Sequence, residues 1–483
     1  MRKKYLPKPA ETSGDETSRR VFGSPPLEIY LSRSADRFEF VQLKEPELIF
    51  GENHRCVDPR TGLAAYGPFS NAGGVGIRQL RIGIVGANEE IEKVLALLEE
   101  ISGPVEQDPK LDSILHPSFP GLNSGKPFLV DLVTQTSWHR SINPQMVRLA
   151  ADCEDSTAKF EMLRELFGAQ VHAMRNLEFP PDFVICSVPE RLDRSLLNAA
   201  CAQFLPVEIV RDGKMPETEG SQLDRATRAW DLSVRLLHKA GLTPWRLADA
   251  AGDTCFVGVS LYRETQSASS HAWSSLAHVV TDLGQGFVLK GDTFEWRPAK
   301  ERGETPHLDK EQSARLMSRV LEIFRKNAGR LPGKVVVHRL SPYIEAERRG
   351  FEESLQGIKR RSLVSVGGRG MFFLRPGRKP VFRGAAIPFE DKLGVVYTSG
   401  YIPFLKCSPV NHLPLPLEIT ENRGTLTFQE AAKDLLRLTK LDLNTSAFCT
   451  EIPVTLSPLT RAREIFTILG EQEVVLEDRY LSS

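Results

Sequence analysis

The residue patterns that most often signal catalysis are missing from this chain of 483 residues. It contains neither GxGxxG nor GxxxxGK[ST], the glycine-rich loops whose backbone N–H groups hold phosphates. No GxSxG surrounds a nucleophilic serine, and none of the seven cysteines forms a CxxC pair. These absences argue against a nucleotide-dependent enzyme, a serine hydrolase and a zinc site. A lone histidine in a strand, such as His338, is expected to be structural.

Two neutral residues stand where a metal-dependent nuclease would need carboxylates. Such an enzyme holds two divalent cations about 4 Å apart with carboxylates at strand ends, so that the metals clamp the attacking and leaving oxygens. The first carboxylate would sit in the opening strand within a pattern such as G-φ-D, where the predicted strand CFVGVSLYRE (255–264) has Ser260. Another would follow the run VVVH, where the predicted strand GKVVVHRLSP (333–342) has Leu340. A serine hydroxyl is neutral and a leucine is apolar, so neither can hold Mg²⁺.

The elements that position these residues alternate between strands and helices. Residues 80–85 form a short apolar run that predicts a buried strand, and an amphipathic helix follows it. The runs 181–192 and 204–212 predict two more strands, and a second unit begins near residue 246. Residues 310–332 predict a long helix that ends at Gly329. This order indicates an α/β protein with largely parallel sheets.

Composition sets few limits on function. The 62 basic and 62 acidic residues cancel, which still permits a basic channel on one face. Residues 1–26 are polar and predict a tail, and they lack the apolar core of a secretory signal. No apolar run approaches the ~20 residues of a membrane-spanning helix. Because the cysteines are scattered and odd in number, we expect reduced thiols and a cytoplasmic protein.

From about residue 43 to its end, the sequence resembles the short prokaryotic Argonautes. Each matching segment is short, but the segments occur in the family's order over most of the chain. The segments are EPELIFG (45–51), DPRTGLAAYGPF (58–69), FPGL (119–122), SVPERL (187–192), LLHKAGLTPWRLAD (236–249), LRPGRKPVFRG (374–384), YTSGYIP (397–403), PLPLEI (414–419), LTKLDLN (438–444) and PVTLSPL (453–459). The resemblance implies a Rossmann-like MID domain followed by an RNase H-like PIWI domain. It divides the chain into a tail (1–26), an N-terminal segment with MID (27–245) and PIWI (246–483).

The resemblance also implies a function without catalysis by this chain. Active PIWI domains use a carboxylate tetrad, and Ser260, Leu340 and Thr460 occupy three of its positions here. Short Argonautes bind a small guide RNA that recognises single-stranded DNA. They act with a partner that carries an APAZ region and a TIR, sirtuin-like or nuclease effector. We therefore expect a subunit of a defence complex against phages and plasmids, with no catalytic metal and no membrane association.

One pocket of the family anchors the 5′ end of the guide. Lys239, within LLHKAGLTPWRLAD, matches the family's lysine that reaches the 5′ phosphate, and a solvent-facing lysine is the alternative. Glu208 stands where the family has a glutamine. The position of the lysine that the family carries in its MID helix falls near Leu197 in this sequence. A glutamate would repel a phosphate. Arg211 and His238 are the candidate substitutes.

Two explanations of these departures remain open. Leu242 also stands where the family has a second glycine, which would crowd a close approach of the backbone. Either the alignment of the MID helix is displaced, or the pocket is remodelled. A remodelled pocket would favour a guide with a 5′ hydroxyl or a phosphate bridged by Mg²⁺.

The resemblance also implies a channel for the guide and the target, which basic side chains would line. The candidates are Arg246, Arg375, Arg378, Lys379 and Arg383. Solvated surface is the alternative interpretation of such a charge run.

Two other functions compete with the guided sensor. Asp253, Glu264 and Asp282 lie near the expected nuclease site in sequence and would form a rearranged carboxylate set. The altered MID pocket also allows a scaffold that no longer binds guides.

Overall fold

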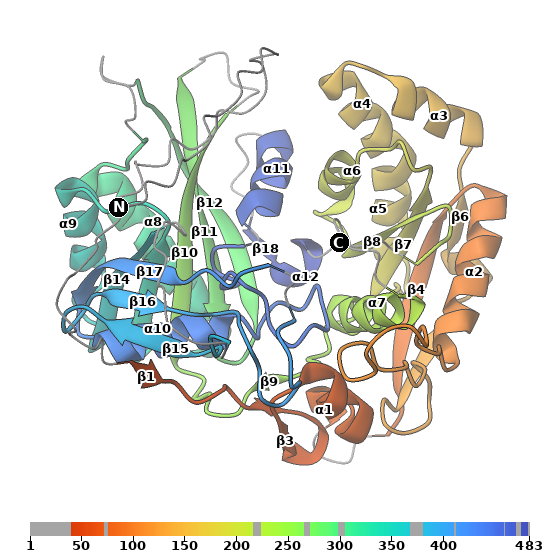
Figure 1. Cartoon of the computed structure of the whole chain (residues 1–483). Helices are drawn as coiled ribbons and strands as arrows, with labels where there is room; N and C mark the ends of the chain where they lie inside the picture. The colour runs from red at the N-terminus through yellow and green to blue at the C-terminus, as the bar shows by residue number, and fades with distance from the viewer. Residues whose placement is uncertain are drawn as a thin grey trace, which may run out of the picture.

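The computed structural model of the chain describes residues 40–71, 76–215, 224–264, 271–297, 305–367, 380–409, 412–457, 459–469 and 475–481. Two layered α/β halves stand side by side, and the N-terminal segment runs beneath both of them (Figure 1). The predicted tail, residues 1–26, lies outside the described residues. The predicted domain boundaries stay a prediction.

The first half is built on a parallel sheet in the order β5-β4-β7-β8, with β6 also pairing with β4. Its strands are β4 (Arg78–Gly86), β5 (Val130–Val133), β6 (His139–Ser141), β7 (Phe183–Val188) and β8 (Val207–Arg211). Every residue of β7 is buried, as expected of a strand with helices on both faces. The strands predicted at 80–85, 181–192 and 204–212 are thus confirmed.

Helices cover both faces of this sheet. They are α2 (Asn88–Ser102), α3 (Pro144–Asp152), α4 (Ser156–Leu163), the π-helical turn η4 (Arg164–Gly168), α5 (Ala169–Arg175), α6 (Arg194–Cys201) and α7 (Arg225–Lys239). Asp224 caps the N-terminus of α7, where its side chain accepts a hydrogen bond from the Thr227 N–H. The helix lies toward the second half (Figure 1) and is buried along most of its length.

The second half is built on a ten-stranded sheet in the order β1-β15-β16-β17-β14-β13-β10-β11-β12-β18. Its central strands are β10 (Thr254–Arg263), β11 (Ala272–Thr281), β12 (Gly286–Glu295), β13 (Lys334–Arg339) and β14 (Arg360–Gly367). Strands β10 to β12 form an antiparallel meander, whereas β13 and β14 run parallel to β10. Helices α8 (Lys310–Ala328) and α9 (Glu345–Ser354) make the crossovers. This is the RNase H-like arrangement that was predicted.

The remaining strands extend the sheet to both edges. They are β15 (Ala385–Pro388), β16 (Gly394–Val396), β17 (Leu417–Gly424), β1 (Val41–Gln42) and β18 (Val475–Glu477). The helices α10 (Phe428–Leu438), α11 (Leu459–Leu469) and α12 (Asp478–Leu481) complete this half. Helix α11 packs against α6, and α12 packs against α7, so the end of the chain joins the two halves.

The N-terminal segment crosses both halves. Its elements are β2 (Leu48–Ile49), η1 (Gly51–Asn53), β3 (Arg55–Cys56), α1 (Pro59–Tyr66) and η2 (Phe69–Asn71). Two short elements lie farther along the chain, namely η3 (Thr136–Trp138) in the first half and β9 (Arg246–Leu247) after α7. Strand β2 pairs with β3 and with β9, which leads into the second half. Strand β1 pairs with β15 at one edge of the large sheet.

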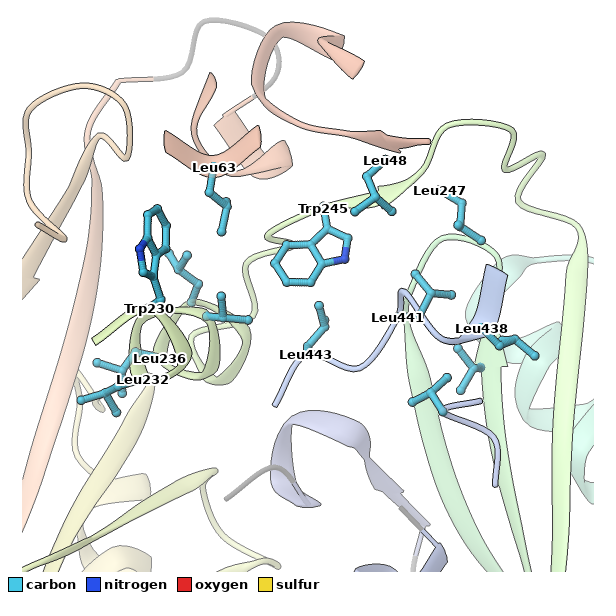
Figure 2. Packing of buried hydrophobic residues seen from close by; sticks show 14 of the residues in the cluster. Leu48, Leu63, Trp230, Leu232, Leu236, Trp245, Leu247, Leu438, Leu441 and Leu443 are labelled. Carbon is cyan, nitrogen blue, oxygen red and sulfur yellow. The ribbon is translucent and has the colours of Figure 1, made fainter. Parts of the chain in front are cut away.

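One hydrophobic core runs through the junction of the halves. Trp245 lies at its centre, between residues of α7 and leucines that follow α10 (Figure 2). The Trp245 indole N–H donates to the Lys440 carbonyl at 2.8 Å. Because apolar side chains from both halves share this core, neither half can separate without exposing it to water. Among the described residues, no helix is both long and apolar enough to cross a bilayer.

Candidate nucleic-acid interface

Ser260 lies in the C-terminal half of β10, three residues before its end, and Leu340 directly follows the neighbouring parallel strand β13. The β10–β13 register pairs Gly258 with His338, and each of the two residues follows two positions later. The alternation of a strand therefore places both on one face of the sheet, next to each other. Leu340 is 62% exposed. Thr460 lies in the first turn of α11, which packs against β10 and β11.

The segment that contains Thr455 packs against β10 at Gly258, two residues before Ser260. A Cβ on Gly258 would meet the Thr455 carbonyl oxygen at 1.7 Å, so β10 needs glycine there. His338 Nδ1 lies 3.2 Å from the Thr455 hydroxyl, and its ring stacks on Phe256. Burial lowers the pKa of His338 to about 3, so the imidazole is neutral. This histidine is part of the core.

The alternative carboxylate set does not come together. Asp253 and Asp282 lie at the amino end of β10, where the Asp282 carboxylate accepts the Ala251 and Gly252 N–H groups. Glu264 follows the other end of this ten-residue strand, about 30 Å away at roughly 3.3 Å per residue. It is buried against Lys290 at 2.6 Å. The predicted rearranged nuclease site is therefore wrong, because its members cannot share a metal ion. In the described parts of the chain, no group of three or more His, Cys, Asp or Glu side chains could hold one.

Lys239 belongs to a buried ion cluster in the first half. Its ammonium lies 3.6 Å from the Glu208 carboxylate, and both side chains are fully buried. Arg235, one turn earlier on α7, donates to the same carboxylate at 3.0 Å. A second Arg235 nitrogen donates to the Asn444 carbonyl of the other half at 3.3 Å. Burial lowers the pKa of Lys239 to about 8, against the opposing effect of Glu208.

The other two residues predicted for this pocket lie elsewhere. Arg211 is exposed at the end of β8, and strand alternation puts it on the opposite face from Glu208. His238 faces the C-terminal helix: burial lowers its pKa to about 4, and the charge of Asp478 acts in the opposite direction. The prediction that Lys239, Arg211 and His238 form one group is therefore wrong. Sequence reasoning missed Arg235, although its spacing of four residues from Lys239 places both on one face of a helix.

The start of α6 lies near this ion cluster. The Asp193 carboxylate accepts hydrogen bonds from the Ser195 and Leu196 N–H groups at 2.8 and 3.2 Å. Leu197, near which the family's lysine was expected, is fully buried in the core. The charge of Arg194, the first residue of α6, acts on Lys239. The Asp193 carboxylate thus occupies backbone N–H groups that could otherwise bind an anion.

The residues predicted for the channel have different environments. Arg246 places its guanidinium over the Phe69 ring, 4.1 Å from the centroid. Arg383 is 3% exposed and donates to Glu45, to the Thr398 carbonyl and to Thr439. Because these contacts use its guanidinium inside the protein, the prediction that Arg383 lines a channel is wrong. Arg375, Arg378 and Lys379 lie outside the described residues.

The arrangement is similar to that of the MID and PIWI halves in solved Argonaute structures. The chain is similar to Clostridium butyricum Argonaute, solved with guide and target DNA, at TM-score 0.58 and 14% identity over 92% of this chain and 55% of that one. It is similar to A. aeolicus Argonaute at TM-score 0.54 and 13% identity, over 93% of this chain and 56% of that one. It is also similar to Drosophila Piwi at TM-score 0.52 and 11% identity, over 92% of this chain and 56% of that one.

These likenesses establish the fold. The chain spans a little over half the length of the solved proteins, 55% to 56% in these three. No protein-family model matches the sequence, and no curated protein matches it.

Proposed function

We propose that this chain is the guide-binding subunit of a prokaryotic defence complex and does not cut nucleic acid itself. One observation carries the proposal: an Argonaute-like fold covers 92% of the chain, with neutral Ser260 in β10 and apolar Leu340 after β13 where carboxylates would be needed. The fold supports holding a guide. These uncharged residues support the absence of cutting, because two metal ions need several anionic ligands.

The proposed guide is a small RNA, and the proposed target is single-stranded DNA. Base pairing would read the sequence, while the protein holds the guide backbone through its phosphates. Since this chain would not act on the target, the response requires an effector in another protein. We propose an APAZ-containing partner with a TIR, sirtuin-like or nuclease domain.

The test is to co-express the chain with the protein encoded beside it, purify the complex and sequence the nucleic acid that comes with it. We expect small RNAs, which load the complex so that a complementary DNA activates the partner. The purified chain, mixed with a guide and a labelled complementary strand in Mg²⁺ or Mn²⁺, should leave that strand intact. Guide-dependent cutting that is absent from a mock purification would overturn the proposal. A complex without nucleic acid would favour the scaffold.

A further inference from the structure

A cavity of about 390 Å³ lies on the second half, between the end of α9 and the paired strands β14 and β17. This volume falls within the roughly 300 to 1,000 Å³ of small-molecule sites. Arg423, Gly424 and Thr425 line the cavity and are exposed, so a ligand can enter it from solvent. Helix α9 and β14 lie on the side of this half that is farther from the first half (Figure 1).

The register of the large sheet separates this cavity from the neutral residues Ser260 and Leu340. Arg361, which lines the cavity, pairs with Val335 near the amino end of β13. Leu340 follows the opposite end of that strand. The two levels are about 17 Å apart at roughly 3.3 Å per residue. The cavity is therefore a second site, and what it binds goes beyond the proposed function.

Arg361 brings a positive charge to the cavity that no carboxylate compensates. Its side chain is half-buried, and its guanidinium donates to the Ile358 carbonyl at 2.7 Å. Among the described residues, no carboxylate forms an ion pair with it. The other cation of the lining, Arg423, already donates to Glu421 at 3.3 Å. A guanidinium that keeps unused N–H groups binds a carboxylate or a phosphate through two parallel hydrogen bonds.

Glu352 limits the charge of the ligand. Its carboxylate lines the cavity together with the two guanidiniums, so the lining carries one net positive charge. A monoanion neutralises that charge. A phosphate ester carries about −2 near pH 7, so its second charge would meet Glu352 without a counter-charge.

The floor of the cavity is apolar. Leu355 and Leu363 line it and belong to the core that the sheet shares with α8 and α9. Apolar surface of this kind favours contact with hydrocarbon over contact with water. The ligand that fits combines a carboxylate with a short aliphatic body.

We propose that this cavity binds a small aliphatic monocarboxylate, with Arg361 holding the carboxylate and the two leucines contacting the hydrocarbon. The Arg361 N–H donates to the Thr425 hydroxyl at 3.0 Å, and the Thr425 N–H donates to the Arg361 carbonyl at 2.8 Å. A ligand on Arg361 would therefore sit on the pairing of β14 with β17. Because it binds the folded state, it should also raise the melting temperature.

The test measures dissociation constants of the full-length chain, without nucleic acid, for three probes by ligand-observed NMR. The probes are hexanoate, hexanamide and hexyl phosphate. We expect saturable binding of hexanoate with a dissociation constant on the order of millimolar, as its few atoms allow. Hexanamide has the same body without the charge and should bind about tenfold more weakly. Hexyl phosphate should also bind more weakly than hexanoate, because of Glu352.

Three variants assign the site. Arg361→Gln should weaken hexanoate binding by about tenfold, the effect of one charge-assisted contact. Arg360→Gln is the matched control: Arg360 is the preceding residue of β14, lies on the opposite face and pairs with Glu430 at 2.5 Å, so its loss should change nothing. Glu352→Gln removes the repelling carboxylate and should tighten the binding of hexyl phosphate, a gain that a misfolded chain cannot mimic.

The inference is overturned if hexanoate does not bind saturably, if hexanamide binds as tightly, or if folded Arg361→Gln binds hexanoate like the unmodified chain. Tighter binding of hexyl phosphate than of hexanoate by the unmodified chain would contradict the role of Glu352, as would an unchanged affinity for hexyl phosphate in Glu352→Gln. None of these results bears on guide binding, because no nucleic acid is present.

Discussion

Glu208, Arg235 and Lys239 form a cluster whose members depend on one another because all three are buried. Removing one partner of a buried ion pair leaves the other charge without full compensation, at a cost of about 3 to 5 kcal/mol. Arg235 still contacts Glu208 after the loss of Lys239. The cost of that loss should therefore fall at the lower end of the range.

We predict that Lys239→Met lowers the free energy of unfolding by about 3 kcal/mol, measured by urea denaturation. The control is Lys93→Met. Lys93 is 49% exposed beside Glu90 on α2, and such surface pairs contribute roughly 0 to 1 kcal/mol. If the two variants are equally stable, the cluster does not contribute to stability.

His338 makes stability depend on pH. Its pKa falls from 6.5 to about 3 on folding because the ring is buried, so the unfolded chain takes up a proton that the folded chain refuses. The contribution is fully present above pH 6.5 and is lost as the pH falls toward 3, by up to about 1.4 kcal/mol per pH unit.

We predict that His338→Gln makes the unfolding free energy less sensitive to pH between 6.5 and about 4, measured by denaturation at a series of pH values. His172→Gln, on the exposed side of α5, should keep the sensitivity of the unmodified chain. Parallel curves for all three proteins would show that His338 titrates alike in the folded and unfolded states.

At the scale of elements, the pairing of β10 with β13 determines what Ser260 and Leu340 could do. Neighbouring strands lie about 4.8 Å apart, so carboxylates at these two positions would be close enough to bind one metal ion. The scaffold is thus predicted to retain the geometry of a metal site without its ligands.

We predict that the double variant Ser260→Asp and Leu340→Asp gains stabilisation by Mn²⁺, because ligands that bind the folded state raise the melting temperature. Thermal denaturation with and without Mn²⁺ measures this gain. The matched control combines Ser260→Asp with Leu331→Asp, which lies before the opposite end of β13 and should not respond. An equal response of both double variants would show non-specific binding.

At the scale of the whole molecule, the core around Trp245 makes the two halves interdependent. Trp245 is 1% exposed, packs with Phe50 of the N-terminal segment and donates to Lys440 of the second half. A residue that joins three parts of a chain affects all of them when it is removed.

We predict that Trp245→Ala costs about 3 to 5 kcal/mol and increases hydrogen exchange in both halves, measured by mass spectrometry on peptides from β7 and β13. Trp273→Ala removes a half-buried tryptophan that contacts Trp296 at the far end of β11. It should affect the second half alone. Faster exchange confined to one half in Trp245→Ala would show that the halves unfold separately.

The sequence by itself determined the elements and their layers. A run such as that of β7, buried on both faces, and the helix that ends at Gly329 are local patterns, because hydrophobic periodicity and caps depend on residues a few positions apart. The neutral residues at 260 and 340 could likewise be predicted, since Ser260 lies within a recognisable strand and Leu340 directly follows another.

The tertiary structure alone decided the environment of each charge. Arg383 finds Glu45 across 338 positions of sequence, and Lys239 finds Glu208 from another element. Arg211 lies three residues after Glu208, and His238 lies next to Lys239, yet neither joins this ion pair. The physical reason is that register and packing select the partner of a buried ion, and desolvation then fixes whether that ion is available to a ligand.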